Sequence, residues 1–160
     1  MTRGVPPPQF RQLLGSFASG VTVLATCDPE GRPVGMTASS VASVSLDPPL
    51  VLVAVSRQSD MHPALLGARY FALSVLAADQ EPLSRRFAEE SGDRFRDVAY
   101  GVSERGVPVL DGVVASIECE KHGAVPGGDH TVFFGLVIGG STWERPPLLY
   151  YRSAYAALVR

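Results

Sequence analysis

Hydrophobic and polar positions alternate along much of this chain, and such alternation predicts β-strands. At positions 42–46, Ala42, Val44 and Leu46 fall on one face of an extended chain and the serines between them on the other, which is typical of a half-buried strand. The prolines at 48 and 49 cannot continue a sheet ladder, so this strand should end there. The uninterrupted apolar run at 50–55 predicts a fully buried strand.

The same reasoning predicts further strands on both sides of this segment. They are expected at 21–27, 70–76, 107–119, 131–138 and 148–151. Turn-forming residues at 28–31 follow the first of these strands, so residues 21–46 are expected to form a hairpin with a polar loop. The segments 56–60, 91–106 and 122–129 are polar or rich in glycine, and we expect them to be surface loops.

A different spacing predicts the helices. One apolar stripe with the spacing i, i+3, i+4 and i+7 is formed by Phe10, Leu13, Leu14 and Phe17. Gly20 should end this helix. A short helical piece is expected at 63–67, and a longer helix should run from the candidate N-cap Asp79 to residue 90, with Leu83 and Phe87 facing inward.

Six or seven short strands with two or three helices predict a mainly β fold, namely a closed or nearly closed antiparallel barrel with flanking helices on its outside. An open α+β sandwich is the alternative. At 160 residues the chain is long enough to bury a core of its own as one domain. Residues 1–9 hold three prolines and no apolar core, so we expect a flexible N-terminal segment rather than a secretory signal, and a single domain over 10–160.

Composition and charge narrow the classes of function. The formal net charge of −2 gives no sign of a surface for nucleic acid or anionic membranes, and no apolar stretch of about 18 residues is present to span a bilayer. We therefore expect a cytoplasmic protein that binds neither nucleic acid nor membranes. Cys27 and Cys119 are too few and too far apart for a disulfide framework, and Cys119 is expected to be a buried thiol.

Several familiar catalytic motifs are missing from the sequence. It contains no G-x-G-x-x-G turn after a strand, no phosphate-binding P-loop and no G-x-S-x-G nucleophile elbow. Residue types that can ligate metals gather at Glu118, Cys119, Glu120, His122 and His130. No second close pair of ligands accompanies them, so we expect no metal site.

Three features remain as candidates for chemistry. The small hydroxyl residues Thr37, Ser39 and Ser40 let backbone N–H groups approach a ligand closely, so they could hold a flat polar ring or a phosphate; an ordinary Ser/Thr-rich strand start is the alternative. His130 stands where a glycine loop meets a strand and could project its ring toward the barrel mouth, or it could be a surface or capping histidine. Candidates for phosphate recognition, or else solvated surface residues, are Arg57, Arg85 and Arg86.

The order of these segments resembles the flavin reductase family with an FMN-binding split-barrel fold, the small reductase component of two-component flavin-dependent monooxygenases. The matching stretches are FRQLLGSFASGVTVLAT (10–26), GMTASSVASVSLDPPLVLVAVSRQS (35–59), FALSVLAADQEPLSRRFA (71–88), DRF (93–95), GVPVLDGVVASIECE (106–120), GGDHTVFFGLV (127–137) and PLLYYRSAY (147–155). They occur in the family's order and cover nearly the whole chain.

The resemblance implies three groups of flavin-binding residues. The isoalloxazine would be held, through backbone amides and the two serine side chains, by Thr37, Ala38, Ser39, Ser40 and Val41. The ribityl chain and phosphate would lie along Ser56, Arg57 and Ser59. The phosphate end would be closed by Arg86, Phe87 and Ala88.

The resemblance also implies a nicotinamide site and a homodimer. His130 would border the nicotinamide, and Tyr151 with Arg152 would sit at the subunit edge of that pocket. A hydride would pass from nicotinamide C4 to flavin N5, so that the cofactors supply the reactivity. The protein would stack the two rings about 3–3.5 Å apart and stabilise negative charge near flavin N1–C2=O with backbone N–H groups. His130 is then a positioning and electrostatic residue.

The expected function is thus an NAD(P)H:flavin oxidoreductase that supplies reduced flavin to a partner monooxygenase. The sequence leaves open FMN or FAD, NADH or NADPH, and whether flavin is tightly bound or a substrate. One alternative is a flavin-binding oxidase or carrier of the same fold that does not use nicotinamide. Another is a non-catalytic interaction domain that keeps the barrel and binds no ligand.

Overall fold

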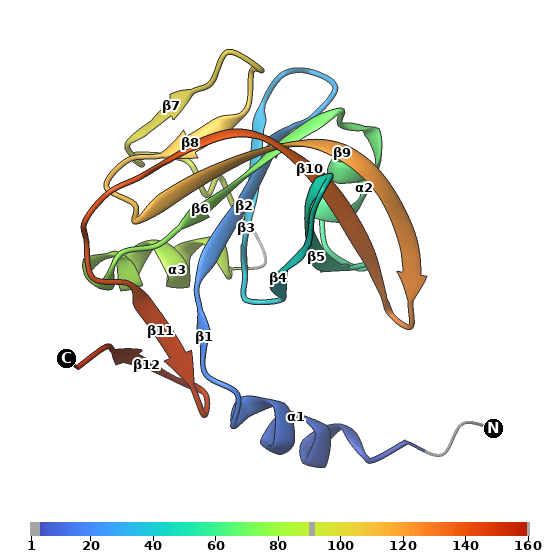
Figure 1. Cartoon of the computed structure of the whole chain (residues 1–160), viewed down its shortest axis with the longest axis vertical. Coiled ribbons are helices and arrows are strands. Elements are labelled where there is room, and N and C mark those ends of the chain that lie inside the picture. Colours follow the sequence, from blue (N-terminus) through green and yellow to red (C-terminus); the bar gives the residue numbers. More distant parts are fainter. Residues whose placement is uncertain (1–3, 90–91, 160) are drawn as a thin grey trace.

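A seven-stranded antiparallel sheet curls into a barrel in the computed structural model, which describes residues 4–89 and 92–159 (Figure 1). In spatial order its strands are β3 (Pro33–Ala38), β2 (Thr22–Cys27), β6 (Tyr70–Val75), β9 (Ala115–Gly127), β10 (His130–Thr142), β5 (Pro49–Ser56) and β4 (Val41–Leu46). The first and last strands of this order, β3 and β4, follow one another in sequence but are not paired in the sheet. The barrel is therefore open between them.

The remaining elements surround the barrel. A small sheet contains β1 (Ser19–Gly20), β11 (Leu148–Tyr151) and β12 (Ala154–Ala157), and a separate hairpin contains β7 (Tyr100–Val102) and β8 (Pro108–Leu110). The helices are α1 (Pro7–Gly15), α2 (Met61–Gly67), the 3-10 turn η1 (Ala78–Gln80) and α3 (Glu81–Phe87). In Figure 1, α1 and the β11–β12 hairpin lie together at one end, away from the barrel. Within the described residues, no helix has the length and apolar character needed to cross a bilayer.

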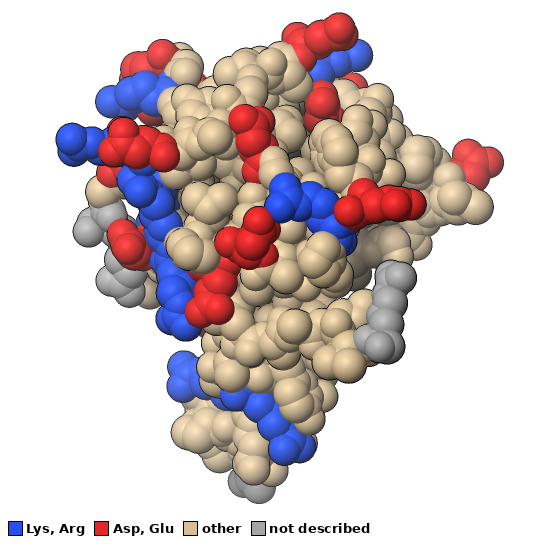
Figure 2. Space-filling view, turned by 90° about the vertical axis from the view of Figure 1, so that its left-hand side faces the viewer, with Lys and Arg blue, Asp and Glu red and all other residues tan. Residues whose placement is uncertain are grey.

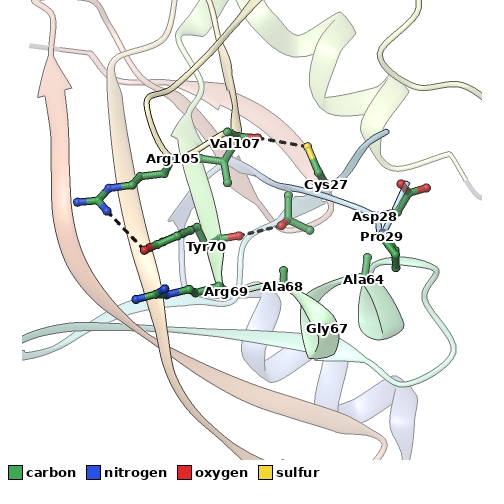
Figure 3. Close-up of a pocket in the computed structure, with 12 residues that line it drawn as sticks. Cys27, Asp28, Pro29, Ala64, Gly67, Ala68, Arg69, Tyr70, Arg105 and Val107 are labelled. Carbon is green, nitrogen blue, oxygen red and sulfur yellow. Dashed lines mark hydrogen bonds between the residues drawn. The ribbon is translucent and has the colours of Figure 1, made fainter. Parts of the chain in front are cut away.

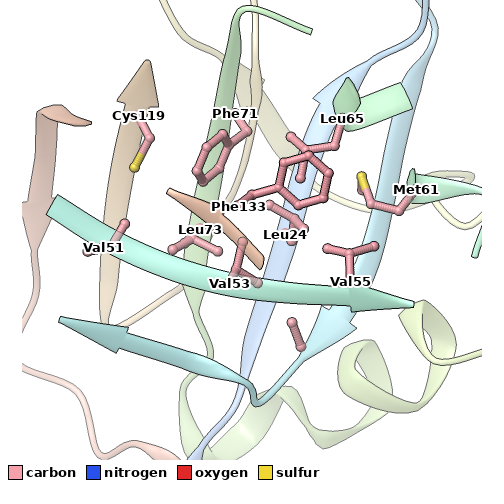
Figure 4. Close-up of a cluster of buried hydrophobic side chains, with 11 residues drawn as sticks. Leu24, Val51, Val53, Val55, Met61, Leu65, Phe71, Leu73, Cys119 and Phe133 are labelled. Atoms are coloured by element: carbon pink, nitrogen blue, oxygen red, sulfur yellow. The ribbon is translucent and has the colours of Figure 1, made fainter. Parts of the chain in front are cut away.

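The barrel interior is filled by side chains. Figure 4 shows this cluster, in which Phe71 and Phe133 are fully buried with aliphatic residues from the surrounding strands. Cys119 belongs to the same cluster, as the sequence predicted, and burial with the nearby charge of Glu118 raises the pKa of its thiol to about 12. Because the interior is occupied, a ligand site has to lie on the outside of the barrel.

A second apolar cluster lies between the barrel wall and α3. Successive side chains of a strand face opposite sides of the sheet, so β2 buries both faces: Leu24 points into the barrel, and Val23 and Ala25 pack outside it. Phe87 of α3 and Phe95 meet there edge to face, with ring centroids 4.9 Å apart. The outer cluster fixes α3 against the strands next to the open edge.

The predicted barrel with flanking helices is confirmed, but the hairpin expected at 21–46 is shorter. It consists of β2 and β3, whereas β4 pairs with β5 at the opposite end of the sheet order. The face of β4 expected to be buried is exposed, with Leu46 93% accessible, because β4 is an edge strand whose register shifts between Ser43 and Ser45. The expectation that β5 is fully buried was also wrong: only alternate residues, such as Val53 and Val55, are buried.

Five other segments differ from expectation. The stretch 91–106 contains β7 and the buried Phe95, 107–119 is divided between β8 and β9, and 122–127 belongs to β9 instead of a loop. The helix expected from Asp79 begins at Glu81 and ends at Phe87, and Asp79 forms an ion pair with Arg145. Helix α1 begins at Pro7 and ends at Gly15, so residues 7–9, expected in a flexible segment, are helical, whereas Phe17 lies beyond the helix and Gly20, expected to end it, belongs to β1. Residues 1–3 of the expected flexible segment and residue 90 of the expected longer helix lie outside the described residues.

Gly140 is required where β10 crosses closely over β9. Its φ of +152° lies in a region that L side chains rarely adopt, and a Cβ there would stand 2.2 Å from the carbonyl oxygen of Ser116. Since that neighbour is backbone, it cannot rotate away. The adjacent Gly139 has open space at its Cβ position.

We predict that Gly140→Ala destabilises the protein by about 2 kcal/mol or more, because the methyl group forces the two longest strands apart. Urea denaturation followed by circular dichroism measures the change. Gly139→Ala is the matched control and should shift the free energy of unfolding by less than about 1 kcal/mol. Equal effects of the two substitutions would show that the close approach at Gly140 is unimportant.

Candidate functional site

The open edge of β3 presents backbone groups that the sheet does not use. The carbonyl of Ala38 accepts a hydrogen bond from the Thr22 hydroxyl on β2, at 2.7 Å, so the backbone of Ala38 faces β2. The carbonyl of Gly35 instead accepts from the Arg94 guanidinium, at 2.8 Å. Because successive residues direct their backbone groups to alternate sides of a strand, the amide of Thr37 faces the open edge together with that of Gly35.

A pocket of about 570 Å³ lies beside this edge. It is lined by Met36, Thr37, Ser56, Gln58, Ser59, Asp60, Phe87, Ala88, Glu89 and Arg94. These residues come from β3, from the end of β5 with its following loop, and from the segment at the end of α3. The structure thus brings together five of the residues singled out from the sequence, namely Thr37, Ser56, Ser59, Phe87 and Ala88.

The loop after β5 is held in shape by its own hydroxyl groups. The Ser56 hydroxyl accepts from the amide of Gln58 at 3.3 Å, and the Ser59 hydroxyl accepts from the amide of Met61 at 3.1 Å. The amide of Ser59 donates in turn to the carbonyl of Ser56. The Ser59 hydroxyl donates in turn to the sulfur of Met36, at 3.7 Å. These bonds fix the two serines at the pocket wall, and the Ser56 hydroxyl, which has no acceptor within the described residues, can donate to a ligand.

Arg94 joins the two sides of the pocket. Its Nη1 donates to the carbonyl of Gly35 on β3 and to Asp60 in the loop before α2, at 2.8 and 3.2 Å. The side chain is only 10% exposed, and its buried Nε has no partner among the described residues. Sequence reasoning did not select Arg94, although it lies in the DRF stretch of the resemblance, because an arginine in a polar segment gives no signal of burial.

The other residues that the resemblance places around the isoalloxazine, Ala38 to Val41, lie at the β3–β4 connection and at the strand ends beside it. The hydroxyl of Ser40 donates to the carbonyl of Ala54 on β5, at 2.9 Å, and so anchors this connection, while Ser39 is exposed. Ala38 is buried in the barrel cluster, and Val41 is half-buried against it. Since the backbone of Ala38 faces β2, it is directed away from the open edge.

The arginines expected at a phosphate, Arg57, Arg85 and Arg86, do not line this pocket. Arg86 lies on a neighbouring pocket of about 360 Å³ that shares Arg94 with the first, and its Nη2 donates to the carbonyl of Asp93 at 3.4 Å. Arg85 is engaged by Glu81 at 2.7 Å. The amide of Arg57 donates to the carbonyl of Asp129, at 3.1 Å, which joins the loop after β5 to the β9–β10 turn.

His130 stands next to the pocket through strand register. It pairs with Ser56, the last residue of β5, so the turn before β10 lies at the same end of the barrel as the pocket. Its Nδ1 lies 2.7 Å from Oδ1 of Asp129, and its ring is 43% exposed. The hydrogen bond from His130 and its charge lower the pKa of the Asp129 carboxyl.

Tyr151 and Arg152 are not brought to this pocket within one chain. Tyr151 is the last residue of β11 and Arg152 follows it in the turn to β12, where its guanidinium lies 5.2 Å from the centroid of the Tyr151 ring. Arg152 instead lines a pocket of about 370 Å³ with α1 residues, including Arg11.

Over the face in Figure 2, acidic and basic side chains alternate on the barrel, whereas blue atoms without red neighbours mark the lower end, where α1 and this hairpin lie.

A further pocket, of about 290 Å³, lies at the other end of α2 (Figure 3). The guanidinium groups of Arg69 and Arg105 lie 5.1 and 5.3 Å from the ring centroid of Tyr70, and Arg105 also donates to the Tyr70 hydroxyl. Cys27 donates to the carbonyl of Gly106, and burial, followed by the nearby charge of Asp28, raises the pKa of its thiol. These polar groups have partners within the protein, so we assign no ligand to this pocket.

A family profile, similar sequences and a solved structure all relate this chain to flavin reductases. The profile of the flavin reductase like domain matches residues 14–158. An FMN reductase (NADH), SmoA, of Agrobacterium fabrum is 44% identical over 151 residues, covering 94% of this chain and 86% of that protein. The reductase subunit HsaB of a flavin-dependent monooxygenase from Rhodococcus jostii is 38% identical over 155 residues, covering 96% of this chain and 79% of that protein.

A solved structure agrees in fold over the full length. The NADH:FAD oxidoreductase of Streptomyces globisporus, in complex with NAD and FAD fragments, superposes with a TM-score of 0.91 at 40% sequence identity. The match covers 99% of this chain and 98% of that one.

We predict that Arg94→Met loosens the open edge of β3. It removes both bonds of Nη1 and leaves the carbonyl of Gly35 without its side-chain partner, at a cost of about 1–3 kcal/mol. Denaturant unfolding and amide hydrogen exchange of β3 measure the effect. Arg96→Met is the matched control, because Arg96 is 79% exposed and should tolerate the change. Unchanged exchange in Arg94→Met would contradict this role.

Proposed function

The chain belongs to the flavin reductase like family, and we propose that it is an NAD(P)H:flavin oxidoreductase that supplies reduced flavin to a partner monooxygenase. The observation that carries this proposal is the pocket at the open barrel edge, which is lined by Thr37, whose amide β2 does not use, and by the hydroxyl residues Ser56 and Ser59. Similar proteins named as NADH-dependent FMN or FAD reductases and as monooxygenase reductase subunits support the activity and its cofactors. The experiment below distinguishes FMN from FAD and NADH from NADPH.

The residues at this edge fit a flavin. A volume of about 570 Å³ lies within the range of about 300–1,000 Å³ typical of small-molecule sites. The amide of Thr37 would donate to the polar edge of the isoalloxazine, next to the β3–β4 connection that carries Ser39 and Ser40. Hydroxyl groups of Ser56 and Ser59 would bind the ribityl chain.

The anionic end of the flavin would meet positive charge. Arg57, on the loop that carries the two serines, and Arg86, on the neighbouring pocket, lie outside the pocket lining and would have to turn toward the ligand. Arg94 lines the pocket itself, where it is paired with Asp60. Phe87 and Ala88 would close this end. Since guanidinium groups bind phosphate oxygens through a fixed fork of donors, this side of the pocket suits the phosphate.

Bound flavin supplies the chemistry by accepting a hydride from the nicotinamide. The chain's part is to hold the ring and to stabilise the negative charge that develops on it, and a preorganised backbone amide such as that of Thr37 does this without reorganisation. His130, beside Ser56, would border the nicotinamide, oriented by Asp129. No ionisable side chain has to change its protonation state for this transfer.

The proposed function is tested by following NADH and NADPH oxidation at 340 nm with FMN or FAD added to the purified protein. We expect turnover that depends on added or bound flavin, and the preferred pair identifies both cofactors. Tight flavin binding without turnover of either nucleotide would contradict the proposal and favour an oxidase or carrier. Neither binding nor turnover would leave a non-catalytic interaction domain.

We predict that His130→Ala raises the KM for the reduced nicotinamide nucleotide about fivefold, because one positioning contact is lost, while flavin binding stays unchanged. Steady-state kinetics and a flavin titration by fluorescence measure the two quantities. His122→Ala is the matched control, an exposed histidine on β9. Unchanged reduction kinetics in His130→Ala would remove this residue from the site.

We also propose that the protein is a homodimer. The apolar residues of α1, such as Phe10 and Leu14, are at least half exposed in the single chain, and Phe17, just after the helix, is 78% accessible. A nine-residue helix with no buried residue is too short to persist alone, since isolated helices below about 12–15 residues are marginal in water. A second copy covering this stripe would bury it, and would bring Tyr151 and Arg152 to the edge of the partner's site.

Both cysteines are free thiols, which supports a reducing, cytoplasmic location.

We predict that light scattering at micromolar concentration gives the mass of a dimer, and that the double variant Phe10→Ser with Leu14→Ser gives that of a monomer. The polar substitutions remove the apolar area that drives association, about 2 kcal/mol or more for each side chain. Val102→Ser is the control, because Val102 is an equally exposed apolar residue on β7. A monomeric wild-type mass would rule out the homodimer.

A further inference from the structure

A chain of hydrogen bonds links the C-terminal hairpin to the open edge of the barrel. The hydroxyl of Tyr155, on β12, lies 2.7 Å from the hydroxyl of Ser84 on α3. The hydroxyl of Thr37, on β3, donates to the backbone carbonyl of Ser84 at 2.6 Å. Ser84 is fully buried between the two. Three segments that are far apart in sequence therefore meet at one serine.

This arrangement fixes both walls of the flavin pocket. The bond from the Thr37 hydroxyl turns that side chain toward α3 and so holds the strand with its amide toward the open edge. The carbonyl of Ser84 also accepts from the amide of Ala88, which lines the same pocket. Any shift of Ser84 would move the two walls relative to each other.

Tyr155 is itself held firmly. Its ring packs against the outer apolar cluster, the Arg85 guanidinium lies 4.9 Å from its centroid, and the Tyr150 ring meets it edge to face at 5.2 Å. These contacts involve the ring and would survive loss of the hydroxyl. Within the described residues, the hydroxyl therefore has one hydrogen-bond partner, the buried Ser84 side chain.

We propose that Tyr155 is a positioning residue for the flavin site, acting through Ser84 on Thr37. This role rests on the proposed flavin reductase function. Tyr155 is not among the described residues that line the pocket, and it sets the distance between β3 and α3, on which the fit of the flavin depends. Without its hydroxyl, the Ser84 side chain is buried without a partner and has to seek another, which disturbs the carbonyl that holds Thr37.

The test compares Tyr155→Phe with the wild type and with Tyr150→Phe. Tyr150 belongs to the same hairpin, and its hydroxyl makes no hydrogen bond within the described residues. We expect Tyr155→Phe to raise the Kd and KM for flavin about tenfold, the consequence of one lost buried hydrogen bond, and to leave the KM for NADH and the kcat at saturating flavin unchanged. Tyr150→Phe should leave all of them unchanged.

A double-mutant cycle with Thr37→Val separates positioning from a general loss of stability. If Tyr155 acts through Thr37, Tyr155→Phe should raise the flavin Kd much less when Thr37→Val is already present. Amide hydrogen exchange of β3, measured without flavin, should become faster in Tyr155→Phe and not in Tyr150→Phe. This readout does not depend on turnover.

Several outcomes would overturn the inference while the reductase function stands. These are a wild-type flavin Kd in Tyr155→Phe, additive effects in the cycle, or an equal effect in Tyr150→Phe. A wild-type protein that neither binds nor reduces flavin would instead overturn both this role and the proposed function. The two failures are thus distinguishable in one set of measurements.

Discussion

The unpaired edge of β3 is the constraint on which the rest of this structure depends. An edge strand exposes backbone donors and acceptors that need partners, and most edges are covered or kept short. Here the carbonyl of Gly35 is bound by Arg94 and the Thr37 side chain is bound by the carbonyl of Ser84. The amides of Gly35 and Thr37 remain at this edge, and Thr37 lines the pocket. A barrel that closed completely between β3 and β4 would have consumed these donors in its own ladder.

The packing of the core explains why the site lies at this edge. Phe71 and Phe133 fill the barrel interior, so no ligand can enter it. The outer cluster around Phe87 and Phe95 presses α3 against β2 and β3, and a Cβ on Gly35 would stand 2.9 Å from the Phe87 ring. The close approach of α3 to β3 places Ala88 and Arg94 opposite the loop after β5. The pocket is the space that these well-packed elements leave between them.

The proposed hydride transfer needs no catalytic acid or base from the side chains, which agrees with a pocket lined mainly by hydroxyl, apolar and backbone groups. Hydride transfer between two cofactors needs alignment and stabilisation of charge, and both can come from backbone amides, hydroxyl groups and fixed cations. Ser56 and Ser59 are held by local hydrogen bonds, and His130 reaches the same end of the barrel because β10 pairs with β5. The residues of the proposed site are thus fixed before any ligand arrives.

The sequence by itself determined the kind of elements, the barrel class and much of the pocket. Alternation marked the strands because each buries one face, and the order of segments carried the resemblance that pointed to Thr37, Ser56, Ser59, Phe87 and Ala88. Tertiary structure decided what depends on distant neighbours. The separation of β3 from β4, the exposure of Leu46 and the burial of Phe95 follow from pairings that local patterns do not encode. The roles of Arg94 and Tyr155 could not be predicted either. A long side chain with a polar end gives the same sequence signal whether that end is solvated or is bonded to a segment far along the chain.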